Sequence, residues 1–115
     1  MNTEYNIPLS TKTFWGIGGP ADEYITIEHI DELPQLWAES HMAKTPVLII
    51  GRGSNSAFAT AGVRGRVIHI AANTIDWVAD NTVVVDAGVV MQQLVEDCAA
   101  RGYSDLKDMS GIPGE

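Results

Sequence analysis

A glycine-rich turn directly after an apolar run is the feature of this sequence with the clearest chemical meaning. The apolar residues 47–50 predict a buried strand, and Gly51–Asn55, with the sequence Gly-Arg-Gly-Ser-Asn, follow without interruption. Glycine permits positive φ angles and close approach of a ligand, and successive amides in such a turn can converge on an anion. The turn is therefore a candidate phosphate site.

The charge around this turn favours an anionic ligand. The chain carries 15 Asp and Glu against 7 Lys and Arg, yet no carboxylate occurs from residue 40 to residue 75. That window contains Lys44, Arg52, Arg64 and Arg66, and the arginines could make bidentate contacts with a pyrophosphate. Buried strands also exclude acids and arginines often lie on solvated surfaces, so a purely structural explanation stays open.

Other chemistries fit the sequence less well. A dinucleotide fingerprint of the Gly-x-Gly-x-x-Gly type needs glycine at position 56, where Ser56 stands, and no Gly-Lys-Ser/Thr follows the turn. His29, His41 and His69 lack metal-ligand spacing, and His69 is interpreted as a satisfied or exposed histidine rather than a catalyst. Ser54 lacks the context of a nucleophile, so we expect it to hydrogen-bond phosphate or backbone.

Length and charge restrict the class of protein. The 115 residues suffice for one domain, and 45% hydrophobic content is ordinary for a globular protein. No apolar run approaches the roughly 20 residues that cross a bilayer, and residues 1–6 lack the features of a secretory signal. The net charge of −8 argues against a nucleic-acid partner, and the single Cys98 fits a reducing compartment. We therefore expect a cytoplasmic protein without membrane contact.

Periodic patterns predict the elements that hold the turn in place. Strands are expected at residues 23–27, 47–50, 66–70, 75–78 and 82–86, and helices from Asp31, as a cap, to about Lys44 and from Met91 to Ala99, with Gly102 as the C-terminal cap. Residues 54–65 are expected to form a long loop. A βαβ unit ending at residue 50 puts the glycine turn at the carboxyl end of a parallel strand, where open α/β sheets bind ligands.

Several motifs occur in a fixed order along nearly the whole chain. They are residues 13–21 (Thr-Phe-Trp-Gly-Ile-Gly-Gly-Pro-Ala), 46–55 with the glycine turn, 62–65 (Gly-Val-Arg-Gly), 86–89 (Asp-Ala-Gly-Val) and 110–114 (Ser-Gly-Ile-Pro-Gly). Each alone is weak, but together and in register they are specific. In this order they resemble the N-terminal part of the UDP-N-acetylenolpyruvoylglucosamine reductases, also called UDP-N-acetylmuramate dehydrogenases.

The resemblance implies a mixed α/β (α+β) FAD-binding fold of the vanillyl-alcohol oxidase type. Residues 1–72 are then the first FAD-binding subdomain, with the βαβ unit, and residues 73–115 begin the second. In that family NADPH reduces the flavin, which passes hydride to the enolpyruvyl group of a UDP-sugar. This is an early cytoplasmic step of peptidoglycan synthesis, and so of cell wall biogenesis, cell shape and cell division.

The resemblance also assigns cofactor-binding residues in two groups. The first group lies in the turn and the second in the later subdomain: Gly51, Arg52, Gly53, Ser54, Asn55 and Ser56, then Ser110, Ile112, Pro113 and Gly114. It assigns no metal ligand and no catalytic residue here. The family's substrate-binding arginine, proton-donating serine and C-terminal glutamate correspond to positions beyond residue 115, so we expect the chain alone to be inactive.

Two departures from the family pattern concern the same region. Val90 stands where a helix-capping serine is common, and Glu115 places a carboxylate near the expected diphosphate. The small-molecule partner implied for the full enzyme is a UDP-sugar, and an exposed apolar face could drive self-association. Two alternatives stay open: a noncatalytic flavin- or nucleotide-binding module completed by a partner chain, and a folded relic that binds nothing.

Overall fold

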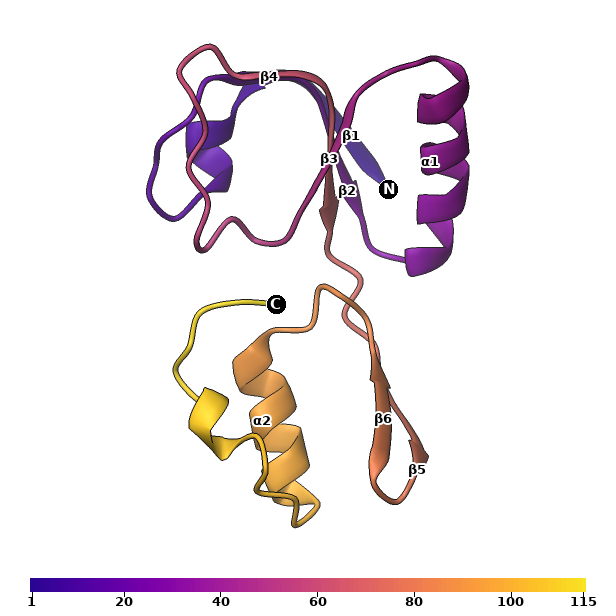
Figure 1. Cartoon of the computed structure of the whole chain (residues 1–115), viewed down its shortest axis with the longest axis vertical. Coiled ribbons are helices and arrows are strands. Elements are labelled where there is room, and N and C mark those ends of the chain that lie inside the picture. Colours follow the sequence, from indigo (N-terminus) through magenta and orange to yellow (C-terminus); the bar gives the residue numbers. More distant parts are fainter.

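Two lobes joined at about residues 71–74 make up the chain (Figure 1). The computed structural model describes all 115 residues. The first lobe contains β1 (Asn2–Pro8), β2 (Pro20–Ile27), α1 (Leu33–Met42), β3 (Val47–Ile50) and β4 (Val63–Ile70), with short 3-10 helices at Leu9–Lys12 and Ile30–Glu32. The second contains β5 (Ile75–Ala79), β6 (Thr82–Val85), α2 (Met91–Ala100) and a 3-10 turn at Lys107–Met109. None of these helices is long and apolar enough to cross a membrane.

The first lobe is built on a four-stranded sheet in the order β1-β2-β4-β3. Strand β1 is antiparallel to β2, while β2 and β3 both run parallel to β4. The predicted βαβ unit is therefore confirmed, but β4 is inserted between its two strands. The crossover helix α1 covers one face of the sheet, and the 3-10 helix after β1 and the long loop before β4 lie over the other (Figure 1).

Alternation along the two central strands gives the sheet two apolar faces. Ile25 and Ile27 of β2 pack with Ile68 and Ile70 of β4, together with Leu36, beneath α1. Tyr24 and Val67 alternate with these residues and point the opposite way, where they form a second cluster with Leu9, Ala21 and Ile50, and Phe58 of the long loop packs against it. Because the second face is covered only by a short helix and a loop, space for a ligand remains near the strand ends.

A polar network fastens α1 to the two central strands of the sheet. The Nε of Arg66 lies 2.5 Å from Oε2 of Glu23, and its Nη1 donates to Oγ of Ser40 at 2.8 Å. Ser40 in turn donates to the Leu36 carbonyl at 2.7 Å. The prediction that Arg66 contacts a pyrophosphate is therefore wrong, because its guanidinium neutralises a carboxylate beneath the helix.

Arg64 is also excluded from the predicted phosphate site. Its guanidinium pairs with Asp22 at 2.5 Å and donates to the Pro20 carbonyl at 3.0 Å, both on the neighbouring strand β2. Asp22 accepts a second bond, from the Gly65 amide at 2.8 Å. Of the three arginines in the acid-free window, Arg52 is therefore the one that lies in the glycine turn.

The first lobe differs from the sequence prediction at its edges. Strand β1 was not predicted, because a polar edge strand buried on neither side carries no alternating pattern. Strands β2 and β4 each begin three residues earlier than expected. Helix α1 begins at Leu33 after a 3-10 turn and has no side-chain cap, so the capping role predicted for Asp31 is wrong.

In the second lobe the predicted helix is confirmed almost residue for residue. Helix α2 ends in a Schellman motif, in which Gly102 has a φ of 89°. Its amide donates to Ala99 O at 3.0 Å, and the Tyr103 amide donates to Cys98 O at 2.9 Å. At the other end Val90 is the N-cap and makes no capping hydrogen bond, so the first amides of α2 depend on other partners.

Candidate functional site

The glycine turn lies at the carboxyl end of β3 and faces the second lobe. Gly53 has a φ of 68°, and a Cβ there would overlap the Lys12 carbonyl oxygen. The Phe14 amide donates to the Gly53 carbonyl at 3.0 Å, which fixes the turn against the segment after β1. Glycine is therefore required at position 53 for both backbone conformation and space.

Four amides of the turn make no hydrogen bond within the protein. No protein carbonyl accepts a hydrogen bond from the amides of Gly51, Gly53, Ser54 or Asn55. The Arg52 amide donates instead to the carboxylate of Glu115, with an N–O distance of 2.8 Å. Amides without internal partners in a glycine-rich turn are compatible with an anion site, and one of them already meets a negatively charged oxygen.

A cavity of about 350 Å³ between the lobes, here called the interlobe cavity, adjoins the turn. Its lining combines residues from both predicted groups with four that were not assigned to the cofactor site, namely Phe14, Val90, Gln92 and Gly111. The full lining is Phe14, Arg52, Ser54, Val90, Gln92, Gly111, Ile112, Pro113 and Gly114. Gly51 and Gly53 lie in the adjoining backbone. The exposed Asn55, which ends the turn, and Ser56 after it do not line the cavity.

Helix α2 holds the later segment against this cavity. Gln92 Oε1 accepts hydrogen bonds from the Ser110 hydroxyl at 3.0 Å and the Gly111 amide at 2.9 Å. The Met91 amide donates to the Gly114 carbonyl at 3.0 Å. Ser110 is therefore engaged with Gln92 in this structure and does not line the interlobe cavity.

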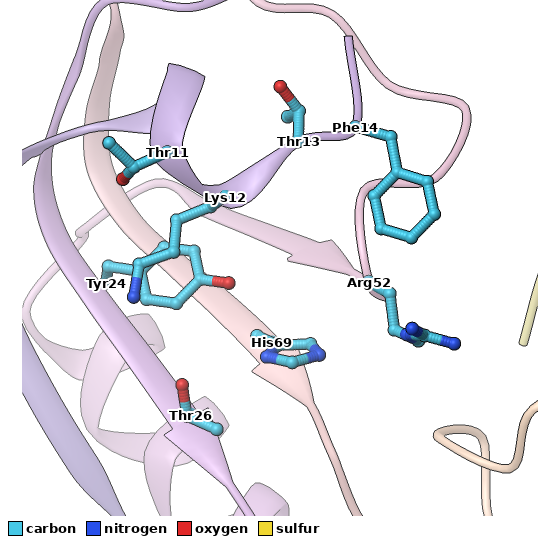
Figure 2. Close-up of a pocket in the computed structure, with 8 residues that line it drawn as sticks. All are labelled: Thr11, Lys12, Thr13, Phe14, Tyr24, Thr26, Arg52 and His69. Atoms are coloured by element: carbon cyan, nitrogen blue, oxygen red, sulfur yellow. The ribbon is translucent and has the colours of Figure 1, made fainter. Parts of the chain in front are cut away.

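A second cavity of about 390 Å³, the sheet-side cavity, opens on the other side of Arg52 and Phe14, which line both (Figure 2). Its remaining walls come from the segment after β1 and from the free face of the central strands: Thr11, Lys12, Thr13, Tyr24, Thr26 and His69. Tyr24 and Thr26 of β2 and His69 of β4 lie on the same face of the sheet. The alternation of residues along these strands is the sequence signal that could have predicted them as neighbours. The site is thus a pair of cavities on either side of one arginine.

His69 is one of two buried polar groups of the sheet-side cavity that lack a hydrogen-bond partner. Its Nε2 is buried and has no hydrogen-bond partner, so the interpretation of His69 as satisfied or exposed is wrong. Burial lowers the pKa of the imidazole below 6.5, and the charges of Lys12 and Arg52 lower it further. The buried Thr13 hydroxyl also lacks a partner. Two unpaired polar groups beside two cations suit a ligand with acceptor oxygens.

Protonation of His69 is expected to destabilise the ligand-free chain. Because its pKa is lower in the folded than in the unfolded state, the unfolded chain binds more protons, and stability falls as pH drops through 6.5. Urea unfolding at about pH 8 and about pH 5.5 measures this loss. We expect His69→Gln to lose less free energy of unfolding over this range than the wild type. His29→Gln, which replaces an exposed histidine, should lose as much free energy of unfolding as the wild type. Equal losses in His69→Gln and His29→Gln would contradict the assignment of the pH effect to His69.

These features together define a class of protein. An α/β lobe with a largely parallel sheet, a glycine turn at a strand's carboxyl end and two adjoining cavities are typical of nucleotide-binding proteins. Residues 21–113 match the family described as FAD binding domain. The chain belongs to this family, its fold is the FAD-binding fold, and FAD is its cofactor.

Proteins similar to this chain carry a common name. It is 35% identical to the UDP-N-acetylenolpyruvoylglucosamine reductase of Thermobifida fusca over 99% of its own length and 34% of that protein. The chain is also 36% identical to the reductase of Solibacter usitatus, over 93% of this chain and 34% of that protein. The crystal structure of the Thermus caldophilus reductase aligns with a TM-score of 0.74 at 34% identity, covering 98% of this chain and 39% of that one. The chain thus spans about a third of the length of these relatives.

Proposed function

We propose that the glycine turn and the segment 110–114 hold the diphosphate of FAD from opposite sides of the interlobe cavity. The observation that carries this is the meeting of Arg52 and Ser54 with Ile112–Gly114 around one cavity, although about 60 residues of sequence separate them. The free turn amides and the Arg52 guanidinium supply donors and positive charge. Ser110, Asn55 and Ser56 stay candidates for contacts to the rest of the cofactor.

We further propose that the two lobes are two FAD-binding subdomains that divide near residue 72. The polar groups of the sheet-side cavity would then meet a part of the cofactor beyond the diphosphate. Lys12 is paired with Glu4 at 2.6 Å, whereas the Thr13 hydroxyl and His69 Nε2 have no hydrogen-bond partner and are open to a ligand. His69 in its neutral form can donate or accept one hydrogen bond there.

The activity that these residues serve is, we propose, that of a flavin-dependent reductase acting in the cytoplasm. Bound FAD supplies hydride transfer, with NADPH as electron donor and UDP-N-acetylenolpyruvoylglucosamine as the acceptor that becomes UDP-N-acetylmuramate in peptidoglycan synthesis. This chain contributes the binding and orientation of the cofactor. The names of the similar proteins support the substrate, and the chain's membership of the FAD binding domain family supports the cofactor.

Titration with flavins is the direct test of the proposed site. We expect FAD and ADP to bind the purified chain and riboflavin to bind more weakly, because riboflavin lacks the diphosphate that the turn amides bind. Flavin fluorescence measures FAD and riboflavin, and calorimetry measures ADP. Equal affinities for FAD and riboflavin would contradict a diphosphate site, and no binding of any of the three would contradict flavin binding altogether.

A chimera tests the reductase function itself. The matching third of the Thermobifida fusca reductase is replaced by this chain, and oxidation of NADPH is followed with and without UDP-N-acetylenolpyruvoylglucosamine. Substrate-dependent oxidation supports the proposed activity. A folded chimera that retains FAD but does not oxidise NADPH instead favours a noncatalytic flavin-binding module.

A further inference from the structure

The carboxylate of Glu115 lies inside the glycine turn. Its Oε2 accepts the Arg52 amide at 2.8 Å, and its Oε1 lies 3.4 Å from Nε of the same residue. The side chain is only 6% exposed. A Cβ added to Gly51 would lie 2.7 Å from Oε2, so the absence of a side chain at position 51 leaves the space that this carboxylate occupies.

The backbone around Glu115 keeps the carboxylate at this position. The Met91 amide donates to the carbonyl of the preceding Gly114, and Gln92 accepts the Gly111 amide. Helix α2 thus anchors the segment, and the bond from Glu115 to Arg52 links the second lobe to the first. Helix α2 therefore positions Glu115, and the glycine turn after β3 positions Arg52.

We propose that Glu115 is an internal anion that occupies the Arg52 amide of the glycine turn and competes with the ligand's diphosphate for it. The idea rests on the proposed function, in which this turn binds a diphosphate. If the Glu115 carboxylate stays in the turn, it repels an incoming diphosphate. If it leaves, its charge-assisted bonds to Arg52 are lost. In both cases Glu115 lowers the affinity for the ligand.

The electrostatics of the contact agree with a displaceable carboxylate. Burial raises the pKa of Glu115, and the amide and guanidinium of Arg52 act in the opposite direction. The charge of Glu115 also contributes to raising the pKa of Tyr24 to about 12, after burial and Glu4. The carboxylate thus loses hydration in the turn, and protonation or departure relieves that cost.

The test compares ADP and FAD affinities of the wild-type chain, Glu115→Gln and Asp108→Asn. Both substitutions remove one negative charge from a chain of net charge −8, but Asp108 is exposed and takes part in none of the ion pairs of the structure. Glutamine keeps the size of the side chain without its charge. We expect Glu115→Gln to bind ADP about tenfold more tightly than the wild type, and Asp108→Asn to leave the Kd unchanged.

A second measurement separates the contact from ligand binding. In ¹⁵N spectra of the ligand-free chain, the Arg52 amide is expected to shift in Glu115→Gln and to stay in place in Asp108→Asn. An unmoved Arg52 amide, or an unchanged or weaker affinity in Glu115→Gln while the wild type binds ADP, overturns the internal-anion role alone. Failure of all three chains to bind ADP or FAD, with the Arg52 shift present, overturns the proposed diphosphate site and the competition with it.

Discussion

Gly53→Asp is expected to abolish measurable binding of ADP and FAD, a loss of about 100-fold or more in affinity. Gly53 has a φ of 68°, and a Cβ at this position would overlap the Lys12 carbonyl. The new carboxylate would also stand among the amides that we propose bind the diphosphate, and each tenfold loss of affinity corresponds to only about 1.4 kcal/mol. Calorimetry with ADP and quenching of flavin fluorescence measure the effect.

Two further variants separate the added charge from backbone strain. Gly53→Ala strains the same turn without adding a charge, so it should weaken binding less than Gly53→Asp. Gly102→Asp adds a charge at a φ of 89° with no atom near its Cβ, at the far end of α2. We expect Gly102→Asp to lower stability and to leave the ADP affinity of the folded protein unchanged. Full ADP affinity in folded Gly53→Asp would remove the diphosphate assignment.

Arg66→Ala is expected to lower the free energy of unfolding by about 2–3 kcal/mol. The side chains of Arg66 and Glu23 are 17% and 19% exposed, so the substitution strands a carboxylate in a poorly hydrated place. It also removes the donor to Ser40 beneath α1. Urea denaturation measures the loss, and the midpoint should fall without a change of slope.

The matched control for this variant is Arg64→Ala, on the same strand. Arg64 is 62% exposed and its partner Asp22 is 45% exposed, so the expected loss is about 0–1 kcal/mol. Adding Glu23→Gln to Arg66→Ala should recover part of the stability, because the stranded charge is then absent. Equal losses in Arg64→Ala and Arg66→Ala would show that burial of the pair is unimportant.

Much of the fold could be predicted from sequence because its signals are local. The apolar period that predicts α2 and the glycine that predicts its C-terminal cap, Gly102, lie within a few residues of each other. Both the helix and the cap were confirmed. Strand β3 and the turn after it were predicted in the same way. The polar edge strand β1 and the 3-10 turn before α1 lack such signals, and there the prediction was incomplete or wrong.

A glycine turn after a parallel strand, with no acid among its neighbours in sequence, follows from the amino-acid sequence alone. The three-dimensional arrangement pairs Arg66 with Glu23 beneath α1 and brings His69, Phe14 and Arg52 into one cavity wall. It also decided that Glu115 reaches the Arg52 amide across 63 positions. Backbone conformation depends on neighbours in sequence, whereas these pairings depend on strand order and on how the two lobes meet, which no local pattern encodes.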